Sequence, residues 1–188
     1  MSLTIVALLA LLCRMSTHGR TLNSFAGPYI AFAERFYNCE TNLSLPWQWA
    51  FHPSRFNPYK PRELQLLTGN LTARNVDMDD SWWLKVILDV WANNQWKENA
   101  FVLFFKNRAC SSLRANTPSF YEHVFKREIK DRCIIKRGVY EVRNAPIEWV
   151  FPNIPIMPYG RYKHRSTSGK ADKYLCLSGE FHAIPKVD

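Results

Sequence analysis

The sequence predicts an all-β domain in which two sheets pack as a sandwich, with one short helix and two disulfides. Runs typical of strands, separated by turn residues, recur along most of the 188 residues. Aromatic side chains, which each bury a large area in such a core, make up 14% of the chain. An N-terminal apolar run precedes five cysteines, four of which lie beyond residue 20, a combination typical of small secreted domains.

The N-terminus predicts the compartment. Residues 3–12 form an apolar run of the length found in signal peptides, too short to cross a bilayer. Thr17 and Gly19 suit the −3 and −1 positions of a cleavage site, although the usual basic n-region is absent. We therefore expect a signal peptide at 1–19, a single domain at 20–188 and a secreted, extracellular protein. A buried core helix is the alternative interpretation of the run.

The cysteines agree with this compartment. Cys13 would leave with the signal peptide, and a lipoprotein site there is disfavoured because Leu12 is too bulky for the preceding position. An even number of cysteines remains, which predicts two disulfides and allows three pairings. None of their spacings resembles a zinc-binding pair. The remaining cysteines are Cys39, Cys110, Cys133 and Cys176.

The most regular strand pattern covers residues 82–91. One of its faces includes Lys85 and Asp89, which are costly to bury unpaired, so we expect the opposite, apolar face to point into the sandwich. The apolar face carries Trp82, Leu84, Val86 and Leu88. The Asn-Asn pair at 93–94 tolerates positive φ and predicts a tight hairpin, which returns through 96–106. Further strands are predicted at 39–51, 63–76, 138–150, 159–167 and 173–184.

One segment has a helical pattern instead. Thr117 can cap a helix that has Pro118 at its first position, and the apolar residues that follow fall on one face of a helix at 117–130. Cys110 and Cys133 bracket this helix. We therefore expect a Cys110–Cys133 disulfide, and by elimination a Cys39–Cys176 disulfide that joins the first and last predicted strands. The Pro-rich stretch 146–158 is interpreted as an extended crossing between strands, because too few residues follow it to form a second domain.

The chain is basic, with a formal net charge of +9. Basic residues cluster at 126–137 and 161–173. Such clusters are most often a solvated face, and contact with anionic lipid headgroups or glycans is the functional alternative. Nucleic acid is a poor partner for a secreted chain.

No specific catalytic pattern is present, so we expect a protein that is not an enzyme and that needs no cofactor or metal. The acidic cluster of Asp77, Asp79 and Asp80 lacks the ligand count of a calcium loop and is interpreted as a turn. The scattered histidines are interpreted as surface or structural residues. They are His52, His123, His164 and His182.

Two sequons, at Asn42 and Asn70, predict N-glycosylation in a secreted chain, whereas Asn116 is followed by Thr-Pro and forms no sequon.

The C-terminal half carries a motif that reads CIIKRGVYEVRN at 133–144 and FPNIPIMPYGRY at 151–162. It resembles the signature of the ML lipid-recognition superfamily, a cysteine, a glycine, a tyrosine and an asparagine at fixed spacing, then P-x-G-x-Y. It is most similar to the arthropod branch that resembles ganglioside activator proteins. The segments LTGNLT at 67–72 and NAFV at 99–102 also resemble that branch, and Ile134 stands where the family usually has proline.

The resemblance implies an immunoglobulin-like two-sheet β-sandwich (ML-type) whose sheets separate to admit a lipid or another hydrophobic small molecule. Further partners would be an anionic membrane surface or a receptor. The alternative is an extracellular interaction protein that contacts a receptor or an anionic glycan without a bound lipid. The residues expected to line the cavity are Trp82, Leu84, Val86, Leu88, Phe101, Leu103, Phe105, Phe151, Ile154 and Ile156.

Overall fold

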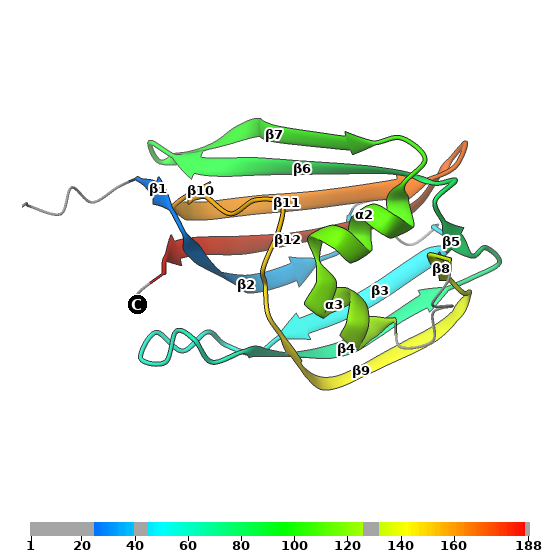
Figure 1. The fold of residues 1–188 in the computed structure, drawn as a ribbon, viewed down its shortest axis with the longest axis horizontal. Helices are drawn as coiled ribbons and strands as arrows, with labels where there is room; N and C mark the ends of the chain where they lie inside the picture. Colours follow the sequence, from blue (N-terminus) through cyan, green and yellow to red (C-terminus); the bar gives the residue numbers. More distant parts are fainter. Residues whose placement is uncertain (1–24, 40–44, 126–131, 187–188) are drawn as a thin grey trace, which may run out of the picture.

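The structure, a computed structural model, describes residues 25–39, 45–125 and 132–186. The predicted signal peptide, Asn42 and residues 126–130 of the predicted helix lie outside the described residues. In the described part of the chain, two antiparallel sheets face each other and form a β-sandwich (Figure 1). The fold class is therefore the predicted one.

The larger sheet has five strands in the order β2-β12-β11-β6-β7, and the smaller has three in the order β3-β4-β9. The five strands are β2 (Tyr29–Tyr37), β12 (Lys173–Pro185), β11 (Gly160–Gly169), β6 (Trp83–Ala92) and β7 (Gln95–Phe105). The three are β3 (Trp47–Pro53), β4 (Gln65–Ala73) and β9 (Gly138–Ile147). Each predicted strand range overlaps one of these strands. β2 lies outside all of the predicted ranges.

Two-residue strand pairs close the two ends of the sandwich (Figure 1). At one end β1 (Ala26–Gly27) pairs with β10 (Met157–Pro158), and at the other β5 (Met78–Asp79) pairs with β8 (Ile134–Ile135). The Pro-rich stretch runs from β9 to β10, so it crosses from the smaller sheet to the side of the larger one (Figure 1).

The hairpin between β6 and β7 turns on Asn93 and Asn94, whose φ angles are 53° and 58°. Two successive residues at positive φ match the twist of the flanking strands, and asparagine tolerates this conformation better than most residues. A bulge follows at Asn99, whose backbone N–H donates to the carboxylate of the buried Asp89 at 2.8 Å. The predicted hairpin is confirmed, and Asp89 has a partner for its buried charge.

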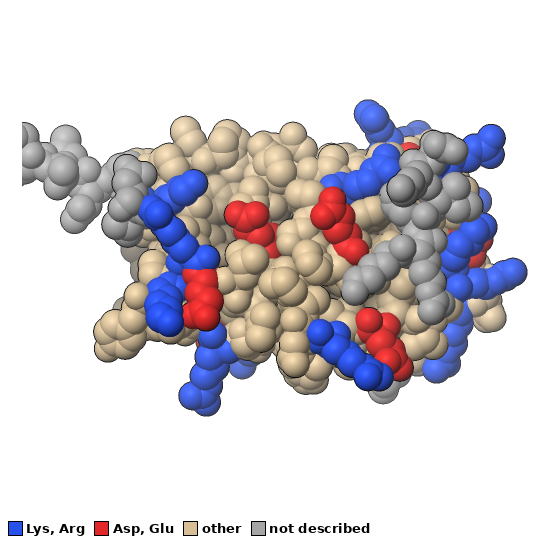
Figure 2. Space-filling model, turned by 60° about the horizontal axis from the view of Figure 1, so that its bottom comes forward, with Lys and Arg blue, Asp and Glu red and all other residues tan. Residues whose placement is uncertain are grey.

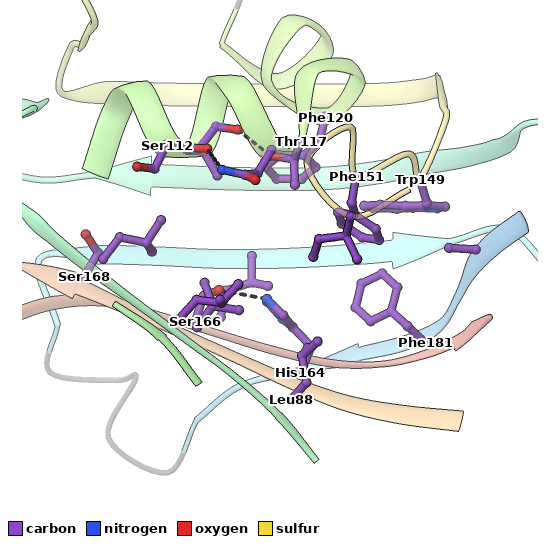
Figure 3. Close-up of a pocket in the computed structure, with 18 of the residues that line it drawn as sticks. Leu88, Ser112, Thr117, Phe120, Trp149, Phe151, His164, Ser166, Ser168 and Phe181 are labelled. Atoms are coloured by element: carbon purple, nitrogen blue, oxygen red, sulfur yellow. Dashed lines mark hydrogen bonds between the residues drawn. The ribbon is translucent and has the colours of Figure 1, made fainter. Parts of the chain in front are cut away.

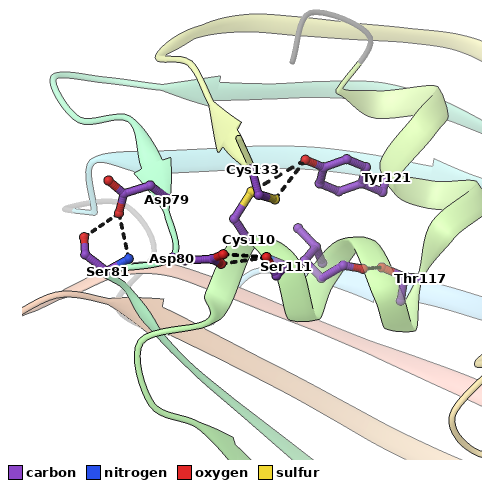
Figure 4. Close-up of a disulfide and its surroundings, with 9 residues drawn as sticks. Asp79, Asp80, Ser81, Cys110, Ser111, Thr117, Tyr121 and Cys133 are labelled. Atoms are coloured by element: carbon purple, nitrogen blue, oxygen red, sulfur yellow. Dashed lines mark hydrogen bonds between the residues drawn. A yellow bond between two sulfur atoms is a disulfide. The ribbon is translucent and has the colours of Figure 1, made fainter. Parts of the chain in front are cut away.

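The structure has two short helices among the described residues, where the sequence predicts one. α3 (Pro118–Val124) corresponds to the predicted helix, and α2 (Ala109–Asn116) is a correction. Arg108 provides no side-chain cap for α2. Instead Asp80 accepts hydrogen bonds from the N–H and the hydroxyl of Ser111 (Figure 4). A cap from so far along the chain leaves no local sequence signal.

Both disulfides have the expected pairing. Cys39–Cys176, with a Cα–Cα distance of 6.0 Å, extends the β2–β12 pair beyond Tyr37 and Ser178. Cys110–Cys133, at 5.6 Å, ties α2 to the residue before β8, and the Tyr121 hydroxyl lies 3.3 Å from the Cys133 sulfur (Figure 4).

An aromatic cluster around Phe36 fills the core between the sheets. Its ring lies 5.6 Å from that of Phe181 in the same sheet, 6.0 Å from that of Trp49 in the opposite sheet, and 5.8 Å from that of Trp149 in the crossing. Such edge-to-face contacts between large rings add to the area that they bury. The cluster joins both sheets and the crossing.

Candidate functional site

A cavity of about 170 Å³ lies between the sheets, beside the two helices (Figure 3). Both sheets, both helices and the Pro-rich crossing contribute to its wall. Its lining side chains are mostly apolar, and none of them is Lys, Arg, Asp or Glu among the described residues. This combination suits an apolar ligand with few polar groups.

The register of β6 and β7 explains which side chains of this hairpin line the cavity. Leu84 pairs with Phe105, and Val86 pairs with Leu103. Directly opposed residues of an antiparallel pair point to the same face, and the face alternates with each residue. These side chains therefore all point into the cavity, whereas Lys85 lies on the outer face.

The structure brings most of the predicted lining residues together. Those that line the cavity are Leu84, Val86, Leu88, Leu103, Phe105, Phe151 and Ile154. The first five come from the β6–β7 hairpin, and the last two come from the crossing that covers it.

Trp82, Phe101 and Ile156 do not line the cavity. Trp82 is 2% exposed and packs against Trp47 at 5.5 Å, so it fills the core beyond the end of the cavity. Phe101 is 43% exposed because it lies on β7, the edge strand of its sheet. Ile156 is 62% exposed, since the crossing turns this side chain to the solvent just before β10.

The cavity opens beside the edge strand. Leu103 lines the cavity and is nevertheless 39% exposed. Its neighbours Val102 and Phe104, on the other face of β7, are also exposed. The apolar lining therefore reaches the surface at β7, next to exposed apolar side chains.

Several lining residues were not predicted. Phe36 comes from β2, which the sequence did not mark as a strand, and Phe120 comes from α3. Leu175, Leu177 and Phe181 come from β12, where the alternation within the predicted strand 173–184 carried a usable signal.

Polar groups occur at few places in the wall. Thr117 donates its hydroxyl hydrogen to the carbonyl oxygen of Leu113 at 2.8 Å, and Ser168 donates to that of Trp83 at 2.6 Å. The Nε2 atom of His164 lies 2.8 Å from the hydroxyl oxygen of Ser166 (Figure 3). Burial away from bulk water lowers the pKa of His164 from 6.5 to about 4, so the ring is neutral at pH 7.

The size of the cavity limits its ligands. A volume of about 170 Å³ is close to that of an engineered apolar cavity of about 150 Å³ that binds benzene. It is smaller than the roughly 300–1,000 Å³ of sites for drug-sized ligands. The cavity therefore suits a slender chain or a small ring better than a lipid with several acyl chains.

A second hollow, of about 390 Å³, lies between β2 and the segment that precedes β4, and it shares Ala31 and Trp149 with the wall of the first cavity. Its wall includes charged side chains, which suit an apolar ligand poorly. These are Arg62, Glu63, Glu148 and Lys186. The cavity between the sheets is therefore the better candidate site.

The three aspartates of the acidic cluster, at 77, 79 and 80, accept hydrogen bonds from different partners. Asp77 lies 3.0 Å from the Lys136 ammonium and accepts from the N–H of Arg137, and these hydrogen bonds hold its carboxyl pKa below the usual range. Asp79 accepts from the N–H of Ser81 at 2.9 Å (Figure 4). Within the described residues, no three His, Cys, Asp or Glu side chains form a group that could hold a metal ion.

The basic residues gather at the ends of the molecule. On the face shown in Figure 2, Lys and Arg lie at both ends, with more of them at the end that holds β5 and β8, and Asp and Glu lie nearer the middle. On the larger sheet, Lys163 lies 4.5 Å from the ring of Trp96, and Arg161 lies 5.7 Å from it.

Asn70, the asparagine of the second predicted sequon, is exposed on β4.

In the part of the chain that the structure describes, none of the helices has the length and apolar character needed to cross a membrane. No protein-family model matches the chain, and no curated protein matches it either.

Proposed function

We propose that the protein is a secreted carrier that binds a lipid or another hydrophobic small molecule between its two sheets. The supporting observation is the apolar cavity itself. Protein interiors are close-packed and rarely leave voids larger than a water molecule. A cavity of about 170 Å³ with an opening beside β7 is more than packing the sandwich requires.

The energetics favour a ligand without any catalytic group. Each methylene that moves from water into an apolar site contributes about 0.8 kcal/mol. A chain of several methylenes therefore gains enough free energy to offset part of the entropy lost on binding. The resemblance to the ML lipid-recognition superfamily supports the same class of ligand.

The proposed secretion rests on the apolar run at 3–12 together with the two disulfides, which persist in oxidising compartments.

The proposal is tested with protein secreted from eukaryotic cells. Native mass spectrometry should show a co-purified hydrophobic molecule, released on denaturation, at no more than one per chain. A fluorescent naphthylamine should bind saturably, and single-chain lipids should displace it. The absence of both a co-purified molecule and saturable binding would contradict the proposal.

A second candidate function is contact with a receptor or an anionic glycan. It is favoured by the half-buried basic and aromatic side chains on the outer face of the larger sheet, where Lys163 and Arg161 lie over Trp96. Binding to immobilised heparin that survives a blocked cavity would favour this function over lipid transport.

A further inference from the structure

His164 occupies a place in the cavity wall that the protein alone does not explain. It lies on β11, the central strand of the larger sheet, between Gly179 of β12 and Leu88 of β6. Its ring contacts that of Phe181 edge to face, with centroids 5.7 Å apart. The side chains labelled around it in Figure 3 are the apolar Leu88 and Phe181 and the polar Ser166, which lies on the same strand.

The hydrogen bonds of this histidine are incomplete. Its Nε2 atom pairs with the Ser166 hydroxyl, but its Nδ1 atom is buried and has no hydrogen-bond partner in the described part of the chain. Two other buried side-chain atoms share this condition, on Tyr37 and Arg161, and neither residue lines the cavity. An unpaired buried polar group destabilises a protein, so such groups call for an explanation by function.

Charge restricts which partner can complete the pair. Because burial keeps the ring neutral at pH 7, His164 offers no positive charge to an anion. No Lys or Arg side chain lines the cavity among the described residues. A carboxylate placed here would be a buried, unpaired charge, which is strongly unfavourable. The group that meets His164 is therefore neutral.

Hydrogen-bonding capacity restricts it further. A neutral imidazole has one donor and one acceptor nitrogen, and the Ser166 hydroxyl can take either role toward Nε2. Nδ1 is then an acceptor or a donor, according to the tautomer. A hydroxyl group fits both cases because it donates and accepts, whereas an ether or ester oxygen only accepts.

We infer that the cavity binds a small neutral alcohol, whose hydroxyl completes the hydrogen bonds of the His164–Ser166 pair while its hydrocarbon part fills the apolar wall. This inference rests on the proposed function and specifies its ligand class. The hydroxyl lies inside the sandwich on β11, and the hydrocarbon extends toward the opening beside β7. The volume of about 170 Å³ limits the buried part to a slender chain or a small ring.

The test compares three probes of equal heavy-atom number or nearly so: 1-decanol, decanoic acid and 1-methoxynonane. Each displaces a fluorescent naphthylamine from the full secreted protein at pH 7.5. We expect 1-decanol to bind about fivefold tighter than the ether, which is the size of one net hydrogen bond, and tighter than the acid as well. In His164→Leu, and in His164→Phe, which keeps a planar ring in the wall but has no ring nitrogen, the three affinities should converge to within about twofold.

His52→Leu is the matched control, because His52 is exposed on the outer face of β3 and should leave the preference for 1-decanol unchanged. His164→Phe keeps an aromatic ring in the wall, so it decides the question even if His164→Leu fails to fold. A wild-type protein that binds all three probes equally would overturn the inference and leave the proposed function standing. A preference for 1-decanol that persists in His164→Phe would overturn it as well. Failure of every probe to displace the dye would overturn both.

Discussion

The side-chain amide of Gln65 pairs with both backbone polar groups of Ala33: it accepts from the N–H at 2.7 Å and donates to the carbonyl oxygen at 2.8 Å. The same amide accepts from the Trp149 indole at 2.9 Å and donates to the Ser54 carbonyl oxygen at 2.7 Å. One buried side chain on β4 thus satisfies the edge of β2 in the opposite sheet and holds the start of the crossing. All four hydrogen-bonding positions of the amide are used.

Replacing Gln65 by Leu should destabilise the fold strongly. The change would leave the Ala33 N–H, the Ala33 carbonyl and the Trp149 indole without partners in the core, and we expect a loss of about 3–5 kcal/mol in the free energy of unfolding. Urea denaturation followed by tryptophan fluorescence measures it. Gln95→Leu, in the exposed β6–β7 hairpin, is the control and should change stability by no more than about 0.5 kcal/mol. Equal effects of the two variants would contradict this role for Gln65.

Val86 and Ile87 are adjacent on β6 and point to opposite faces, which makes a matched pair for testing the cavity. Val86→Trp should fill the cavity and weaken binding of a naphthylamine probe more than tenfold, while secretion continues. Ile87→Trp adds the same volume on the outer face and should bind the probe normally. If Val86→Trp folds and binds normally, the assigned wall is wrong. If it is not secreted, overpacking of a dry core is the better explanation.

His164, in the cavity wall, should make stability depend on pH. The unfolded chain takes up a proton near pH 6.5, whereas the folded chain, with a His164 pKa of about 4, does not. Stability is therefore full above pH 6.5 and falls as the pH falls toward 4. Between pH 7.5 and pH 5 we expect the wild type to lose about 2 kcal/mol more than His164→Gln. The free energy of unfolding at the two pH values measures this, and His52→Gln should behave as the wild type. Equal losses in wild type and His164→Gln would show that the histidine is not kept neutral.

The two disulfides should differ in their contribution to stability. They close loops with sequence separations of 137 and 23 residues. In the chain-entropy model the longer loop contributes about 5 kcal/mol and the shorter about 3 kcal/mol. Replacing both Cys39 and Cys176 by Ala should therefore lower the denaturation midpoint more than replacing both Cys110 and Cys133. The reverse order would indicate that packing around the buried Cys110, rather than loop closure, determines the cost.

Asn70 should carry a glycan when an animal cell secretes the protein. It is exposed on β4, while the next residue, Leu71, is buried. Asn70→Gln and Thr72→Ala should remove the same mass, since either change destroys the sequon. Treatment with a glycosidase that leaves the mass of the wild type unchanged would contradict the prediction for both Asn70 and Asn42.

The parts of the fold that follow a local period could be predicted from the sequence. In β6 the position of Lys85 and Asp89 on one face identified the opposite face as the one that meets the cavity, and the asparagine pair at 93–94 identified the hairpin. β2 does not alternate, because a bulge opposite Glu180 and Phe181 changes its phase. Ala33 and Phe36 therefore both point inward at a spacing of three, which no strand pattern predicts.

The residues of the site could likewise be predicted only where they follow a local period in the sequence. Its hairpin residues follow from the period of β6, but the contribution of Phe36 depends on the bulge in β2. From the sequence alone, His164 is interpreted as a surface or satisfied structural residue. Its unpaired Nδ1 atom depends on which groups surround the ring, and only the folded structure shows them.

Both covalent cross-links leave the two layers independent of each other. Cys39–Cys176 fastens neighbouring strands of one sheet, and Cys110–Cys133 fastens a helix to a loop. The spacing of the layers is therefore set by side-chain contacts alone, with the Gln65 amide as a hydrogen-bonded anchor along one edge. A thicker ligand would reduce the packing contacts along the β7 side but would break no covalent bond. Selection among ligands would then depend on their thickness more than on their length, since the far end of a long chain can remain outside the cavity.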